Sequence, residues 1–196
     1  MFYNNLLYVC RNILVISIMK KTKIISKILY ALTRSLAWIY LAIGLYGTFA
    51  WITKTNIQTA DTTTIINYPF TDISFLILDN DQSYFLFAFL LPVLSYTLFF
   101  WLLSNVFKVF YQDKLFTNPN IGHLKRFYLA NITLPIVLVA FSSFFIAIEK
   151  GIFIIVALHL VLGVFIFIIS EIFHQGAVIT ERTGPIHLSY ANYYKY

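Results

Sequence analysis

Long apolar runs alternate with short polar segments along most of the chain. Four of these runs are long enough for about 20 helical residues to cross a bilayer, at about residues 28–53, 84–107, 127–148 and 152–173. The first run contains one charged residue, Arg34, placed so that its side chain can reach the lipid headgroups. Gly44 and Gly47 lie three residues apart and not four, so they carry little weight as a helix-packing motif. The pattern predicts an all-α integral membrane four-helix bundle.

The segment between the first two spans, residues 54–82, is the longest polar stretch. Its threonines and the apolar residues 73–78 favour extended structure. We expect a small extracytoplasmic loop region here, built around a hairpin. In the second span, Pro92 should kink the helix or leave one backbone carbonyl open, because proline has no N–H.

Composition supports the membrane assignment. The chain has 196 residues, of which 60% are hydrophobic and 11% charged, whereas soluble domains carry about 25% charged residues. The single cysteine, Cys10, excludes an intramolecular disulfide and a CxxC metal site. We find no motif for a cofactor, so none is expected, and no catalytic motif.

The chain divides into three parts. Residues 1–27 form a basic N-terminal segment, in which Met19 is the expected start and a short interfacial helix is the alternative for residues 1–18. Residues 28–173 form the transmembrane domain, with a polar loop at 108–126. Residues 174–196 form a polar, tyrosine-rich tail.

Charge sets the expected orientation. With the N-terminus inside, only Lys54 and Lys150 fall outside, which leaves twelve of the fourteen basic residues on the inner side. Such a bias of lysine and arginine determines topology. We therefore place both termini and loop 108–126 in the cytoplasm of a multi-pass cell-membrane protein. The net charge of +6 follows from topology, and direct nucleic-acid binding is not expected.

The loop contains the start signal of the third helix. Asn118 followed by Pro119 predicts an N-cap and a first helical residue. Ile121, Leu124 and Tyr128 fall three and four residues apart, so one apolar face of this helix can contact lipid or a neighbouring helix.

Three ionisable residues are candidates for chemistry. His159 lies inside an apolar run, and we favour an interhelical hydrogen bond over a proton or metal role. Glu171 and His174 are three residues apart, a spacing that can supply two metal ligands. We favour instead a structural clamp in which Glu171 pairs with Lys125 or Arg126 or caps the helix after the loop.

Two short elements resemble those of the bacterial domain of unknown function 2975 family. The first follows the pattern F-T-x-x-N-x-x-x-L and comprises Phe116, Thr117, Asn120 and Leu124. The second follows the last span and comprises Glu171, Phe173, Gly176, Ala177 and Ile179. The resemblance implies a four-span protein of a bacterial inner membrane, often encoded beside a small helix-turn-helix regulator, with no established activity. The tail departs from the family at Arg182, where acidic residues are usual.

Three hypotheses of function follow. The first, which we prefer, is a non-enzymatic sensor, regulator or accessory subunit in the lipid bilayer, whose loop and tail contact a membrane or cytoplasmic protein partner. The second is a small homo-oligomeric transporter or channel with a cavity around Pro92, Pro135 and Asn131. The third is a membrane enzyme that uses His159, or Glu171 with His174.

Overall fold

Four long helical segments make up most of the described part of the chain. The computed structural model describes residues 2–60, 63–79 and 82–193, and the side chains of residues 20–59, 63–79 and 82–182. The helices are α1 (Phe2–Thr53), α2 (Gln82–Tyr84), the π-helix η1 (Phe85–Leu90), α3 (Leu91–Tyr111), α4 (Asn118–Ser142) and α5 (Lys150–Tyr193). The segments long and apolar enough to cross a membrane are Lys20–Thr53, Gln82–Tyr111, Asn118–Ser142 and Lys150–Arg182. The predicted all-α membrane bundle is confirmed.

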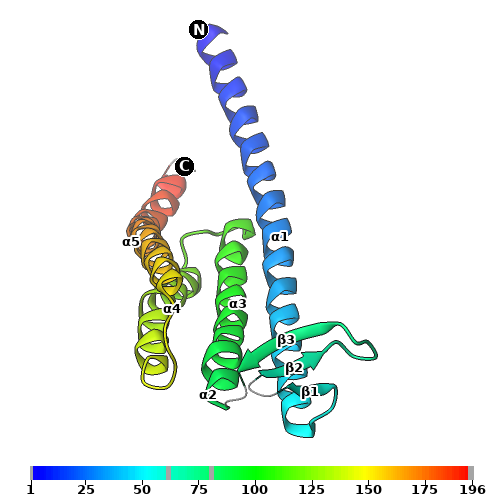
Figure 1. The fold of residues 1–196 in the computed structure, drawn as a ribbon. Coiled ribbons are helices and arrows are strands. Elements are labelled where there is room, and N and C mark those ends of the chain that lie inside the picture. Colours follow the sequence, from blue (N-terminus) through cyan, green and yellow to red (C-terminus); the bar gives the residue numbers. More distant parts are fainter. Residues whose placement is uncertain (1, 61–62, 80–81, 194–196) are drawn as a thin grey trace.

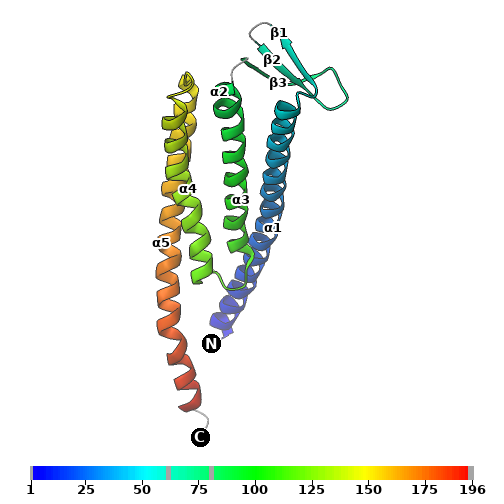
Figure 2. The same cartoon turned by 90° about the horizontal axis from the view of Figure 1, so that it is seen from below.

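The helices are arranged around α3. It packs against α1 on one side and α4 on the other, and α5 packs against α4 (Figures 1 and 2). The start of α1 and the end of α5 lie at one end of the bundle, which we call the terminal end (Figure 2). The opposite end carries the three strands and the turn between α4 and α5, and we call it the sheet end (Figure 2).

Side-chain pairs join α1 to the continuous helical segment of η1 and α3 in antiparallel order. At the terminal end, Lys23 forms an ion pair of 2.7 Å with Asp113, which follows α3. Further along, the rings of Trp38 and Trp101 meet edge to face at 5.8 Å. Near the sheet end, Trp51 stacks on Phe85 with centroids 4.4 Å apart. These contacts place equivalent depths of the two helices side by side along their whole shared length.

Gly47 lies at the closest approach of α1 to η1. A Cβ atom at this position would lie 2.7 Å from Cζ of Phe89. Gly44, one turn away, faces Val93, which would lie 3.2 Å from an added Cβ. The small weight given to this glycine pair from sequence was therefore wrong, because the spacing of three also places both residues on the face that contacts the next helix.

Pro92 follows a π-turn in its helix. The N–H of Leu91 donates to the carbonyl of Leu86, five residues earlier, and Pro92 lies in the first turn of α3. The proline cannot donate to the Ala88 carbonyl, and its ring crowds the preceding turn. The wider π-turn accommodates it, so the helix continues without a break.

The segment after α1 forms an antiparallel sheet of three strands. They run in the order β1 (Ile57–Ala60), β2 (Thr63–Asn67) and β3 (Ser74–Asp79). Ile66 of β2 is fully buried against Ala50, Phe85 and Phe89. The Tyr46 hydroxyl donates to the carbonyl of Asn67, which ties the sheet to α1. The predicted extended structure is confirmed, with one strand more than a hairpin.

The ends of the helices differ from the predicted spans. α1 is continuous from Phe2, so the segment before the first span is neither irregular nor a separate short helix. α5 continues through the predicted tail to Tyr193. α4 ends at Ser142, not at residue 148, because the backbone then closes into a tight turn in which the N–H of Phe145 donates to the Ser142 carbonyl.

Candidate functional site

A compact apolar cluster closes the terminal half of the bundle. It combines residues of α3, α4 and α5, and its buried members are Val106, Val109, Leu124, Phe127, Ile166 and Phe173. Leu124 and Phe127 have no exposed surface. Ile121 and Tyr128 pack against the cluster, so the apolar face predicted for α4 contacts neighbouring helices.

Asn120 fixes the loop that leads into α4. Its amide nitrogen donates to the carbonyls of Lys114, at 3.0 Å, and Leu115, at 2.9 Å, and its side chain is buried. The N-cap of α4 is Thr117, which has extended backbone angles, and not Asn118. The predicted start was one residue too late because Pro119 fits the second helical position as well as the first.

Phe116 rests on α5 at Gly176. A Cβ on Gly176 would lie 2.6 Å from Cδ1 of Phe116, and the Phe116 ring meets Phe173 edge to face at 5.2 Å. The two short sequence elements, one containing Phe116 and the other containing Phe173 and Gly176, therefore meet in space. We call this contact between Phe116, Phe173 and Gly176 the loop clasp.

A shallow groove of about 230 Å³ lies beside the loop clasp. Its lining residues come from the end of the α3–α4 loop, the first residue of α4 and α5, and they are Phe116, Thr117, Asn118, Ala177, Thr180 and Glu181. Phe116 keeps 42% of its surface exposed. The groove thus combines an accessible aromatic ring with hydroxyl and carboxylate groups.

Glu171 and His174 stay on the surface and do not form the expected clamp. Both side chains are exposed. Among the described residues, no ion pair joins Glu171 to Lys125 or Arg126, so that expectation was wrong. The described part of the chain also contains no group of three metal-ligating side chains. The connection between loop and α5 is apolar and runs through the loop clasp.

The interhelical hydrogen bond predicted for His159 is confirmed. Nδ1 of His159, on α5, lies 2.7 Å from Oδ1 of Asn131, on α4. The Asn131 amide nitrogen donates to the Phe127 carbonyl at 3.0 Å, which leaves its oxygen facing the imidazole. Asn131 Oδ1 can only accept, so His159 carries its hydrogen on Nδ1.

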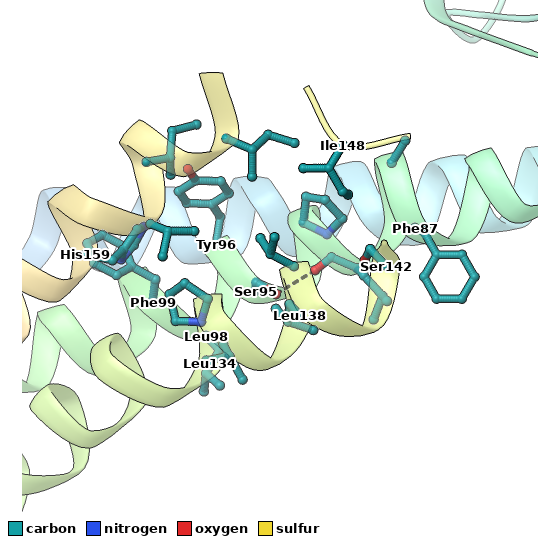
Figure 3. Close-up of a pocket in the computed structure, with 18 of the residues that line it drawn as sticks. Phe87, Ser95, Tyr96, Leu98, Phe99, Leu134, Leu138, Ser142, Ile148 and His159 are labelled. Carbon is teal, nitrogen blue, oxygen red and sulfur yellow. Dashed lines mark hydrogen bonds between the residues drawn. The ribbon is translucent and has the colours of Figure 1, made fainter. Parts of the chain in front are cut away.

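A cavity of about 470 Å³ opens from this pair towards the sheet end. α3, α4 and α5 surround it, and His159 and Phe99 lie at one end while Phe87 and Ile148 lie at the other (Figure 3). Its lining includes Pro92, Pro135 and Asn131, the three residues expected from sequence to surround a cavity.

Arg34 has a role that sequence reasoning missed. Its guanidinium lies 3.2 Å from the ring centroid of Trp101, and Nη1 donates to the buried hydroxyl of Ser104 at 3.3 Å. It therefore joins α1 to α3, which corrects the expectation that it simply extends to the headgroups. A tryptophan and a serine three residues apart on the partner helix are the signal that points to this site.

At the terminal end, one ion pair has an electrostatic signature. The hydrogen bond from Lys23 and the positive charge of Lys23 lower the pKa of Asp113 below its usual range. The Asp113 side chain is 97% exposed, so solvent screens this interaction strongly.

No family model, curated protein or solved structure matches this chain. The resemblance to the domain of unknown function 2975 family therefore stays a prediction. The chain is an integral, multi-pass membrane protein, with four apolar helical spans in the part that the structure describes.

Proposed function

We propose that this membrane protein is a non-enzymatic sensor, regulator or accessory subunit that binds a protein partner at its terminal end. In this proposal the terminal end faces the cytoplasm. The single observation that carries it is the loop clasp: the loop between α3 and α4 is seated on α5, beside an accessible groove.

The shape of the terminal end supports binding of a partner. α5 continues from Gly176 to Tyr193, a distance of about 25 Å at 1.5 Å per residue, and extends beyond α3 and α4 (Figure 2). α1 likewise begins at Phe2, well before Lys23 meets Asp113. Two helices that extend beyond the bundle give a partner surface to contact without disturbing the spans.

The distribution of charge supports the orientation. Lys125 and Arg126 follow the loop clasp on α4, and both are exposed. Lys54 and Lys150 flank the sheet and the α4–α5 turn at the other end. An excess of lysine and arginine is typical of the cytoplasmic side.

Crosslinking from native membranes tests the proposal. An affinity-tagged chain with a photoactivatable phenylalanine analogue at Thr180 is irradiated, purified and analysed by mass spectrometry. We expect one stoichiometric protein partner. The Gly176→Leu variant should lose it, because the new side chain displaces Phe116.

Gly122→Leu is the matched control, since an added Cβ at Gly122 meets no atom within 4 Å. It changes the same residue type on the neighbouring helix and should keep the partner. Recovery of no stoichiometric partner by the wild-type chain, or equal recovery by both variants, would contradict the proposal.

A small transporter is the second candidate, because the cavity is lined by Pro92, Pro135 and Asn131. A transporter requires an internal cavity, and this bundle contains one. The cluster around Leu124 and Phe127 closes the terminal half, however, so transport would need α4 and α5 to move apart there. Solute flux into proteoliposomes that is lost in Asn131→Leu would favour this candidate over the first.

A further inference from the structure

The cavity described above has the dimensions of a site for one elongated small molecule. It extends from His159 on α5 to Glu149, the residue before α5, ten residues or about 15 Å of helical rise, which is half of the roughly 30 Å hydrocarbon core. Its volume of about 470 Å³ lies in the range of about 300–1,000 Å³ that is typical of ligand pockets. The volume is sufficient for a single chain but too small for a two-chain phospholipid.

The walls of the cavity select an apolar body. Most side chains along its length are aliphatic or aromatic, and they include Leu91, Leu98, Leu134, Leu138, Val139 and Val156. The lining residues all belong to the described part of the chain, and among them only Glu149, at the sheet end, is an acid, while none is a lysine or arginine. A charged group would lack a counter-ion in the depth of the cavity, so a neutral ligand is favoured.

The deep end supplies an acceptor. Because Nδ1 of His159 donates to Asn131, the other ring nitrogen, Nε2, has a free lone pair. No buried side-chain nitrogen or oxygen of the described residues lacks a partner, so Nε2 must reach accessible space. His159 lines the cavity (Figure 3), and a ligand can place a hydrogen-bond donor against this nitrogen.

Two prolines remove the ordinary donors of two backbone carbonyls beside the same cavity. Pro92 cannot donate to the Ala88 carbonyl, and Pro135 cannot donate to the Asn131 carbonyl, so both carbonyls lose their ordinary α-helical donor. All four residues line the cavity. The hydroxyls in the lining, such as those of Tyr96 and Ser142, can donate or accept, but Nε2 of His159 can only accept, which points to a ligand that donates a hydrogen bond there.

We propose that the cavity binds a neutral, single-chain amphiphile whose terminal hydroxyl donates to Nε2 of His159, with the chain directed towards the sheet end. This site is separate from the loop clasp, and the proposal does not depend on a protein partner. The ligand enters from the bilayer, in which such a molecule dissolves.

Photolabelling in lipid nanodiscs tests this proposal. The probe is a twelve-carbon primary alcohol with a diazirine in mid-chain, and its methyl ether, which cannot donate, is the matched control. We expect the alcohol to label cavity residues of α3, α4 or α5 and unlabelled 1-dodecanol to compete. Loss of the hydrogen bond should weaken labelling by the ether about three- to tenfold.

Two variants separate the cavity from the outer surface of the bundle. Val139→Trp fills the cavity and should abolish site-specific labelling. Val161→Trp is the control, because Val161 lies outside the cavity lining with 68% of its surface exposed, and it should label like the wild type. His159→Leu should reduce labelling by the alcohol to the level of the ether.

Equal labelling by alcohol and ether would overturn the proposal, since it would show nonspecific partition into an apolar space. Labelling that survives Val139→Trp would overturn it as well. If His159→Leu does not elute as a folded species, the comparison of alcohol with ether on the wild-type protein still decides the role of the hydrogen bond.

Discussion

Gly47→Ala is the substitution whose effect the structure defines most sharply. Gly47 is buried where α1 crosses η1, and the added methyl group would lie 2.7 Å from Cζ of Phe89 and closer still to Cε1. Real Cβ atoms essentially never approach so closely. Phe89 cannot easily move, because Phe85 and Phe75 lie against its ring at centroid distances of 5.6 and 6.2 Å.

The expected magnitude follows from two opposed effects. Inserting one carbon into a well-packed cluster costs about 1–3 kcal/mol. Replacing glycine by alanine within a helix returns at most about 1 kcal/mol, and less when the unfolded chain stays helical in the bilayer. We therefore expect Gly47→Ala to lower the free energy of unfolding by about 1–2 kcal/mol. Gly122→Ala, which meets no atom, should leave it unchanged or raise it slightly.

Unfolding by SDS in mixed micelles, followed by tryptophan fluorescence, measures the difference. Trp51 stacks on Phe85 within the affected cluster and reports on its opening. Phe89→Leu should partly rescue Gly47→Ala, because the smaller side chain leaves room for the methyl group, so the double-mutant cycle should show favourable coupling. Equal stability of Gly47→Ala and Gly122→Ala, or strict additivity with Phe89→Leu, would refute the explanation by close packing.

Three further predictions concern one hydrogen bond, one ion pair and the orientation of the chain. A double-mutant cycle with Asn131→Leu and His159→Leu should give a coupling energy of about 0.5–1.7 kcal/mol, as for other hydrogen bonds between membrane helices, and zero coupling in the SDS assay would count against this bond. Pairing lowers the pKa of Asp113, so its stabilisation is present at neutral pH and is lost as pH falls below about 4. The stability difference between wild type and Asp113→Asn, measured across pH 3–7, should therefore be small and confined to the upper part of that range; a difference that grows on acidification would have the wrong sign. Phe116→Cys, in a chain whose native cysteine is removed, should react with a membrane-impermeant maleimide only after cells are opened, and labelling of intact cells would reverse the proposed orientation.

The spans could be predicted because transfer of apolar side chains from water dominates their energetics. A run such as residues 152–173 has few polar residues, and any helix that contains it must cross the bilayer or be buried. The hydrogen bond of His159 was also accessible to sequence reasoning, since an imidazole inside an apolar run needs a partner.

Contacts that depend on how two helices face each other could not be predicted in the same way. An added Cβ would meet Phe89 at Gly47, Ile132 at Gly163 and Phe116 at Gly176, yet it would meet nothing at Gly122. The sequence does not distinguish the glycines that face a close neighbour from the glycine that faces none. The difference lies in the rotation and separation of the neighbouring helix. The same reason explains why Arg34 was expected at the headgroups and not on Trp101.

The extents of the first and last helices were missed for a different reason. Polar residues at both ends indicated where the hydrocarbon stops, and the prediction treated that boundary as the end of the helix. A helix satisfies its own backbone hydrogen bonds in water as well as in lipid. α5 can therefore leave the bilayer and continue to Tyr193 without a change in backbone structure.

The π-turn before Pro92 has a consequence for how this chain can vary. One additional residue in a helical turn rotates the side chains before it by about 100° relative to those after it. In η1 this rotates Phe85 and Phe87 together relative to α3, so that Phe85 stacks on Trp51 of α1 and Phe87 stacks on Phe145 beyond α4, both with centroids 4.4 Å apart. Deletion of a single residue here would restore regular spacing and turn both rings away from these partners. Related chains should therefore exchange residue types within this turn far more readily than they gain or lose a position.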